Sequence, residues 1–301
     1  MEEIFAGMIR TATPILLAAL GGILCEKVGV FNIALEGLML FGAFFGVYAV
    51  SLTGEPLMAL LAALAVGAIG GLIYVILVEL LKTDATIASI GMNTFALGLT
   101  TYLMKMVFGD EGSIRSANIV GFSKLEIPWL EKIPFIGKVL GGHTVLVYVS
   151  LLLVVLMQIF IYKTRTGINL RAVGENPLAA TSAGISVKRY RIISVVVAGM
   201  LCGLAGVHLS LGYVTMFTEN MTGGRGFFSY TAVVFGQANP VIVMIASFVF
   251  GLSETLAYRF QQSGVPVPLV LTIPYVITVI ALIIRNVRIK KTKRLIEGKV
   301  E

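Results

Sequence analysis

Long apolar runs, each close to the length of a membrane-spanning helix, recur along almost the whole of this 301-residue chain. A bilayer core of about 30 Å takes roughly 20 residues of helix to cross. The period-two alternation typical of lipid-facing β-strands is absent. The pattern therefore predicts an all-α integral membrane protein with about nine transmembrane segments, within a range of eight to ten. The runs cover residues 4–25, 37–52, 57–81, 85–108, 143–162, 192–211, 241–260 and 265–284, together with a shorter run at 227–238.

Composition excludes a water-soluble protein. Apolar residues make up 57% of the chain and charged residues 13%, with a mean hydropathy of +0.94, whereas soluble domains carry roughly 25% charged residues. A globular surface cannot be covered by so few charges, so lipid must cover it. We expect no enzyme activity, because a carboxylate cluster, a Ser/Lys pair and a His-rich site are all absent. We also expect no metal site, because His143 and His208 have no ligating neighbours at the required spacing.

The positive charges gather in two stretches that adjoin apolar runs. The net charge is +7, but its placement argues against nucleic acid as a partner. Residues 163–191 hold six cations against the single acid Glu175, and the tail 285–301 holds seven. Clusters of Lys and Arg beside membrane segments mark cytoplasmic loops. We therefore place both stretches in the cytoplasm, where the tail also meets anionic membrane lipid.

This orientation divides the chain into two halves. Four crossings must separate the basic loop from the basic tail if the short run 227–238 counts as a broken crossing, and the N-terminus then lies outside. Each half has four elements that run in opposite directions, as in the inverted repeats of transporters. We predict one membrane domain over residues 1–301. Its parts are a first repeat (1–108), an external cap (109–142), a linking helix (143–163), a cytoplasmic loop (164–191), a second repeat (192–284) and a basic tail (285–301).

The second element of each half contains glycines and polar groups beside apolar runs. These interruptions lie at residues 26–37 and 222–230. Non-helical backbone at membrane depth is tolerated only where protein buries it or water lines it, and interruptions at matching positions point to a translocation pathway. The candidate pathway residues are Phe31, Asn32, Glu36, Asn93, Phe227, Phe228 and Tyr230.

Each candidate also has a structural interpretation. Glu36 has three possible roles: to cap local amides near the cytoplasmic face, to pair with Lys27, or to line the pathway. Asn32 and Asn93 either bind a polar solute or tie helices together. The aromatic rings either stack on a planar substrate or pack. The glycine-rich residues 223–226 are not a phosphate loop, because no Lys-Ser/Thr pair follows them.

The cytoplasmic loop contains a short, defined helix. Asn176 is a suitable N-cap and Pro177 is suited to the first helical position. The predicted helix, residues 178–183, is rich in small side chains such as Ala180, which suits insertion into a groove of a partner. The alternative is a solvated connecting loop.

Residues 171–184 resemble the coupling segment of permeases in the branched-chain amino acid and ribose family of ABC importers, and the order of segments matches along the whole chain. Residues 26–37, with Phe31-Asn32-Ile33 and Glu36-Gly37, are similar to the nucleoside permeases that depend on basic membrane lipoproteins. The Asp-Leu-Ser-Val-Gly pattern of ribose permeases and the Leu-Asn-x-Ala-His-Gly pattern of amino-acid permeases are absent.

The resemblance implies a permease subunit that forms half of the pathway of an ATP-driven nucleoside importer in the bacterial plasma membrane. It implies three partners: a second, different permease subunit, an ATPase with tandem nucleotide-binding domains, and a substrate-binding lipoprotein. ATP and Mg would bind to the ATPase, and this chain would hold no cofactor. Two alternatives remain, namely a permease for ribose or another simple sugar, and an ion-coupled secondary transporter. The residues that the resemblance assigns to ATPase coupling are Arg171, Gly174, Glu175, Asn176, Pro177, Ala180 and Gly184.

Overall fold

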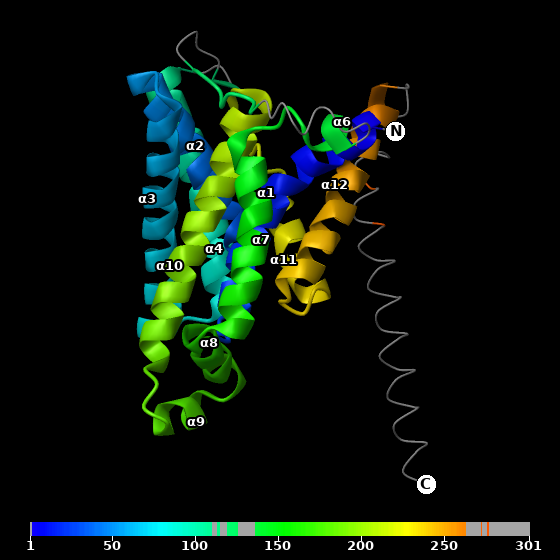
Figure 1. The fold of residues 1–301 in the computed structure, drawn as a ribbon. Coiled ribbons are helices and arrows are strands. Elements are labelled where there is room, and N and C mark those ends of the chain that lie inside the picture. Colours follow the sequence, from blue (N-terminus) through cyan, green and yellow to red (C-terminus); the bar gives the residue numbers. More distant parts are fainter. Residues whose placement is uncertain are drawn as a thin grey trace.

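A computed structural model describes residues 2–109, 113–114, 119–125, 136–262, 272 and 276. These parts of the chain are almost wholly helical (Figure 1). The first half contains α1 (Glu2–Lys27), α2 (Leu35–Thr53), α3 (Pro56–Val75), the π-helix η1 (Ile76–Leu80) and α4 (Ala85–Phe108). Two short elements, β1 (Ser113–Ile114) and α6 (Ile136–Leu140), precede α7 (Val145–Lys163), and α8 (Arg165–Glu175) and α9 (Pro177–Ser182) follow it. The second half contains α10 (Val187–Val207), the π-helix η2 (His208–Val214), β2 (Phe217–Thr218), α11 (Arg225–Phe235) and α12 (Pro240–Gln262).

Seven helices in the described residues are long and apolar enough to cross a membrane. They coincide with seven of the predicted runs, and the prediction of an all-α membrane fold is confirmed. The short run at 227–238 forms α11, a helix of only 11 residues. The tail 285–301 lies outside the described residues, as do half of the predicted cap at 109–142 and the run at 265–284 apart from residues 272 and 276.

Helix α1 forms the centre of the fold. Its middle, from Ile15 to Cys25, is buried on all sides, and it packs against α10, α12, α11 and α7. Near its N-terminal end, the Thr11 hydroxyl donates a hydrogen bond of 2.8 Å to the carbonyl of Gly251 in α12. Helices in a membrane associate through such small residues and interhelical hydrogen bonds. Near the C-terminal end of α1, Gly22 lies against Leu35 of α2 and Val233 of α11, so α1 contacts both of these helices.

Glycines bring α10 into direct backbone contact with α2 and α3. Gly199 of α10 packs on Gly67 of α3, and Gly203 of α10 packs on Gly42 of α2, so closely that a Cβ on any of them would collide with backbone. Small residues give membrane helices this close approach. The contacts tie the second half of the chain to the first.

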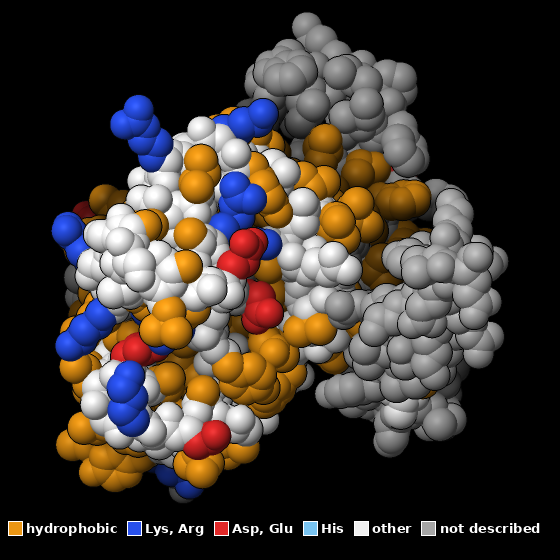
Figure 2. Space-filling view, turned by 90° about the horizontal axis from the view of Figure 1, so that it is seen from below, with side chains coloured by type: hydrophobic (Ala, Val, Ile, Leu, Met, Phe, Trp, Pro, Cys, Tyr) orange, Lys and Arg blue, Asp and Glu red, His pale blue; other side chains and the backbone are white. Residues whose placement is uncertain are grey.

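The two ends of the molecule differ. Figure 1 shows α8 and α9 at one end, and the N-terminus, α6 and the α2–α3 turn at the opposite end. Seen from the α9 end, the surface carries Lys and Arg side chains scattered over it (Figure 2). At the opposite end, β1 pairs with β2 in antiparallel fashion. This arrangement agrees with the predicted orientation, in which the basic loop and the N-terminus lie on opposite sides.

Candidate functional site: a junction of interrupted helices and a cytoplasmic loop helix

The two interrupted elements meet in space. Glu36, the second residue of α2, is nearly buried, and its carboxylate accepts hydrogen bonds from the backbone N–H groups of Gly224 (2.8 Å) and Gly226 (2.6 Å) at the start of α11. The unpaired N–H groups and the partial positive charge of a helix N-terminus favour an anion there. Glu36 therefore caps a helix that belongs to the other half of the chain.

Two of the structural roles considered for Glu36 are wrong. The carboxylate does not cap amides of its own helix, because its partners are almost 190 residues away along the chain. It does not pair with Lys27 either, since the ammonium of Lys27 lies 3.5 Å from the carbonyl of Gln237 in the α11–α12 turn. The pathway role stays a prediction.

The junction lies near the middle of the membrane. The C-terminal end of α11 adjoins Lys27, which lines one cavity with Arg171 and Gly174 of α8 and Gln237. An 11-residue helix is about 16 Å long, which is about half of a 30 Å bilayer core. The N-terminus of α11, where Glu36 lies, is therefore at the depth at which discontinuous helices of transporters form their central sites.

Glycine is required at this junction. Gly224 has φ +87°, in the left-handed region where side chains are strained. Gly226 packs on the backbone of Glu36 so closely that a Cβ would overlap it. The glycine-rich residues 223–226 thus allow the start of α11 to approach the start of α2 closely.

A second charge pair supports the same helix end. The guanidinium of Arg225, at the start of α11, is buried against Glu254 of α12 and lies 3.2 Å from the hydroxyl of Tyr258. It also donates to the carbonyl oxygens of Met221 and Thr222 in the turn before α11. This pair was not predicted from the sequence. A signal was present, since Glu254 is an acid within an apolar run.

The aromatic candidates divide into two groups. Phe31 and Tyr230 meet edge to face with 5.5 Å between ring centroids, which places one ring from each interrupted element side by side. Phe31 is 37% exposed and Phe227 is 47% exposed. Phe228 instead stacks on Phe250 at 5.6 Å and packs against the core. Phe31 and Phe227 are therefore exposed, whereas Phe228 and Tyr230 are both partly buried and pack against the core.

The side chains of both candidate asparagines form hydrogen bonds with backbone groups. Asn32 is 2% exposed, and its side-chain oxygen accepts from the N–H of Ala34 at 2.9 Å. Asn93 of α4 accepts from the N–H of Gly37 at 2.8 Å and donates to the carbonyl of Ile33 at 3.1 Å. Asn93 thus ties α4 to the start of α2, and both amides shape the turn that presents Glu36.

The loop helix α9 has a well-defined start and end. The side-chain oxygen of Asn176 accepts from the N–H of Ala179 at 3.0 Å, with Pro177 at the first helical position. At its other end Gly184 has φ +79°, and the N–H of Ile185 donates to the carbonyl of Ala180 at 2.9 Å. This is the Schellman arrangement of helix ends. The predicted helix is present, and its residues 177–182 match the expected range closely.

Comparisons with known proteins identify the family. The model described as "Branched-chain amino acid transport system / permease component" matches residues 4–282. This chain belongs to that permease family. It is 34% identical to the guanosine ABC transporter permease protein NupQ of Bacillus subtilis, over 90% of this chain and 88% of NupQ.

Two other relatives and one solved structure extend the likeness. NupP, a second guanosine ABC transporter permease protein of Bacillus subtilis, is 31% identical over 97% of this chain and 83% of its own. TsgB13, a glucose ABC transporter permease protein of Haloferax volcanii, is 28% identical over 89% of this chain and 74% of its own. An inward-facing ABC transporter structure aligns with a TM-score of 0.51 at 14% identity, covering 92% of this chain and 84% of that one. The protein is a multi-pass plasma-membrane permease, and a transport component rather than an enzyme.

The exposed face of α9 corrects the expectation that Ala180 enters a groove of a partner. Leu178 is 82% exposed, and Ala179 and Thr181 are also exposed, but Ala180 is only 3% exposed and packs into the permease's own core. Ala180 is therefore not free to enter the groove of another protein. The contact surface of α9 has to be formed by its neighbours.

Two other coupling candidates, Gly174 and Arg171, contact the membrane helices. Gly174 of α8 lies against the backbone of Lys27, where a Cβ would collide with the carbonyl. The guanidinium of Arg171 lies over the ring of Tyr162, 5.1 Å from its centroid. Glu175 is exposed. The loop of the permease thus lies against the end of α1, the helix at the centre of the fold.

Among the described residues, no group of three His, Cys, Asp or Glu side chains is placed to hold a metal ion.

Proposed function

We propose that this permease is one of two different membrane subunits of an ATP-driven importer for nucleosides, and that it forms half of the translocation pathway. The observation that carries the proposal is α9, a capped and exposed helix at the end of the molecule where the basic loop lies. Uphill transport requires energy, and residues 223–226 are not a phosphate loop. We propose that the energy comes from another protein, for which α9 supplies a contact.

The partner that fits α9 is an ATPase with tandem nucleotide-binding domains, which would bind ATP and Mg. Movement of α9 would pass to α8, because Gly174 of α8 touches the backbone of Lys27 at the end of α1. It would then reach the end of α11 through the ammonium of Lys27, which lies 3.5 Å from the carbonyl of Gln237. A displacement at the loop would therefore reach the junction at Glu36. Alternating access by rocking of one repeat against the other is the mode that inverted repeats allow.

The pathway would need a second permease. Phe31 and Phe227 are large rings left exposed on this chain, and an exposed apolar face is typical of an interaction surface. Two guanosine permeases of one bacterium, NupQ and NupP, both resemble this chain. This pairing supports a heterodimer of permeases, to which a substrate-binding lipoprotein would deliver the solute.

Nucleosides are the substrate class best supported. Relatives at 34% and 31% identity are named for guanosine, and we propose that a planar base passes the edge-to-face pair Phe31–Tyr230. A simple sugar such as ribose or glucose is the second candidate, favoured by the likeness to TsgB13.

Transport by the reconstituted importer tests the proposal. The permease, its partner permease, ATPase and lipoprotein would be placed in proteoliposomes, and uptake of labelled guanosine, ribose and glucose would be measured. We expect guanosine uptake that requires ATP and survives collapse of ion gradients. Uptake of sugar alone would favour the second candidate. Uptake driven by an ion gradient without the ATPase would show an ion-coupled secondary transporter and overturn the proposal.

A further inference from the structure

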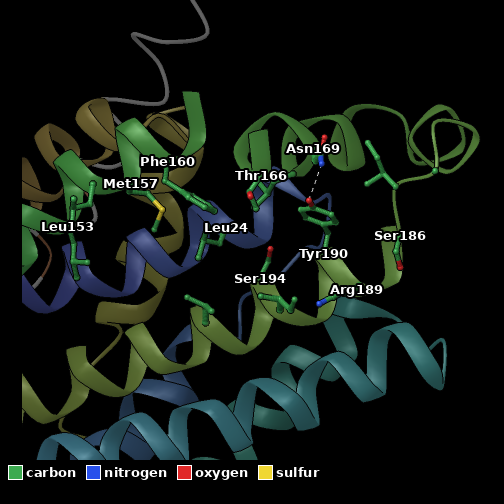
Figure 3. A pocket seen from close by; sticks show the side chains of 16 residues that line it. Leu24, Leu153, Met157, Phe160, Thr166, Asn169, Ser186, Arg189, Tyr190 and Ser194 are labelled. Atoms are coloured by element: carbon green, nitrogen blue, oxygen red, sulfur yellow. Dashed lines mark hydrogen bonds between the residues drawn. The ribbon is translucent and has the colours of Figure 1, made fainter. Parts of the chain in front are cut away.

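A groove with a cavity volume of about 740 Å³ runs between α7 and α10. Leu24 of the buried helix α1 contributes to its lining, and α8 borders one end (Figure 3). Since α7 ends at Lys163 and α10 begins at Val187, this end of the groove is level with the cytoplasmic ends of two spanning helices. The groove therefore extends from the membrane surface into the hydrocarbon.

The lining changes from apolar to polar along the groove. Figure 3 shows Leu153, Met157 and Phe160 toward one end and Asn169 and Tyr190 toward the other. The amide of Asn169 donates to the hydroxyl of Tyr190 at 3.1 Å, so this polar pair joins α8 to α10 at the mouth. The groove is apolar at membrane depth and polar at the membrane surface. A phospholipid has the same order, with its acyl chains in the membrane and its headgroup at the surface.

A cation stands at the polar mouth without an internal partner. Arg189 lines the groove and is exposed, and no acidic group of the described chain pairs with it. Arg191, two residues further on, is instead bound to Glu79 at 2.7 Å. Loop cations beside a membrane segment attract the anionic lipids of the cytoplasmic leaflet. Arg189 is thus placed to bind a phosphate.

We propose that this groove binds an anionic phospholipid of the cytoplasmic leaflet, such as phosphatidylglycerol. One acyl chain lies between α7 and α10 against Leu156 and Ile193, which are large apolar side chains about half exposed. The headgroup phosphate lies at Arg189. The lipid joins α10 to the loop that carries α9, and this binding does not depend on which solute is transported.

Native mass spectrometry of the full chain, in the complex in which it purifies, tests the site. The probes are phosphatidylglycerol and phosphatidylcholine with identical acyl chains, supplied in equal amounts. We expect phosphatidylglycerol to be retained several-fold more than phosphatidylcholine. We expect Arg189→Gln to remove that preference, whereas Lys188→Gln, an exposed neighbour that does not line the groove, leaves it unchanged. Equal retention of the two lipids, or an unchanged preference in Arg189→Gln, would overturn the proposal.

Filling the apolar end of the groove gives a second, independent test of the lipid site. Leu156→Trp fills the groove and should lower retention of both lipids several-fold. Leu152→Trp is the matched control, since Leu152 is 56% exposed on the same helix, one turn away, and does not line the groove. If the two Trp variants retain phosphatidylglycerol equally, the acyl chain does not lie there and the site is wrong. If Leu156→Trp fails to fold, the comparison of Arg189→Gln with Lys188→Gln decides.

Discussion

The carboxylate of Glu36 lies 2.6 Å from the backbone nitrogen of Gly226, a residue of the opposite half of the chain. One side chain thus joins the start of α2 to the start of α11 near the middle of the membrane. The junction is held by charge at Glu36, by close backbone contact at Gly226 and by the pair Arg225–Glu254. These three devices can be tested separately.

Removing the charge of Glu36 should weaken the junction. Glu36→Gln keeps one carbonyl acceptor, but it loses the charge that the N-terminus of α11 favours. Hydrogen bonds to charged groups contribute about 1.5–3 kcal/mol, so we expect a loss of stability of that order and slower transport. Thermal unfolding in detergent measures the first effect. The control is Glu55→Gln, since Glu55 is exposed and its side chain makes no cap bond; equal melting temperatures for the two variants would contradict the account.

Adding one methyl group at Gly226 should separate the two helices. The Cβ of Gly226→Ala would overlap the backbone of Glu36, which cannot move without displacing α2. We expect a strongly reduced yield of folded permease in size-exclusion chromatography. Gly98→Ala is the control, because a Cβ there meets nothing within 4 Å and alanine favours helix by up to about 1 kcal/mol. A normal yield from Gly226→Ala would show that the contact is looser than described.

The pair Arg225–Glu254 predicts a pattern across single and double variants. Arg225→Met leaves the buried carboxylate of Glu254 without its partner, which costs about 3–5 kcal/mol. Replacing both members by Met removes both charges and should recover most of that loss. Melting temperatures of the two single variants and the double variant form the cycle. A double variant that is destabilised by the sum of the single effects would mean that the two groups act independently.

Much of the fold follows from the sequence, because 20-residue apolar runs and clustered cations report directly on the membrane. The local helix at 177–182 was also predictable, since Asn176 and Pro177 are adjacent to it. Contacts between residues far apart in the chain were not predictable. Nothing near Glu36 shows that its partners are almost 190 residues away.

The direction in which a side chain points was the other feature that the sequence did not predict. A six-residue helix has too few positions to reveal a buried face, so Ala180 was assigned to the contact surface although it packs inward. Asn32 and Asn93 were equally ambiguous, because the turn they support is not visible in the pattern of hydrophobic positions.

The orientation can be tested with single cysteines. Thr53, beside the α2–α3 turn, and Thr181, in α9, are both exposed and lie at opposite ends of the molecule. The native Cys25 and Cys202 are buried, which keeps background labelling low. An impermeant maleimide should label Thr53→Cys in intact cells, and Thr181→Cys only after the membrane is permeabilised. The reverse pattern would invert the topology.

The central claim is that an ATPase drives this permease through α9. Leu178 is the most exposed large side chain of that helix, and Leu178→Arg places a bulky charge where a groove would receive a leucine. Leu57→Arg, at the exposed start of α3 on the opposite end, is the control.

The decisive measurement is ATP-driven guanosine uptake by proteoliposomes that contain the assembled importer, with ATP hydrolysis recorded in the same samples. The account predicts that Leu178→Arg abolishes uptake and the stimulation of ATP hydrolysis by substrate, while Leu57→Arg retains both. Wild-type uptake and hydrolysis by Leu178→Arg would contradict it, and α9 would then be a solvated connection.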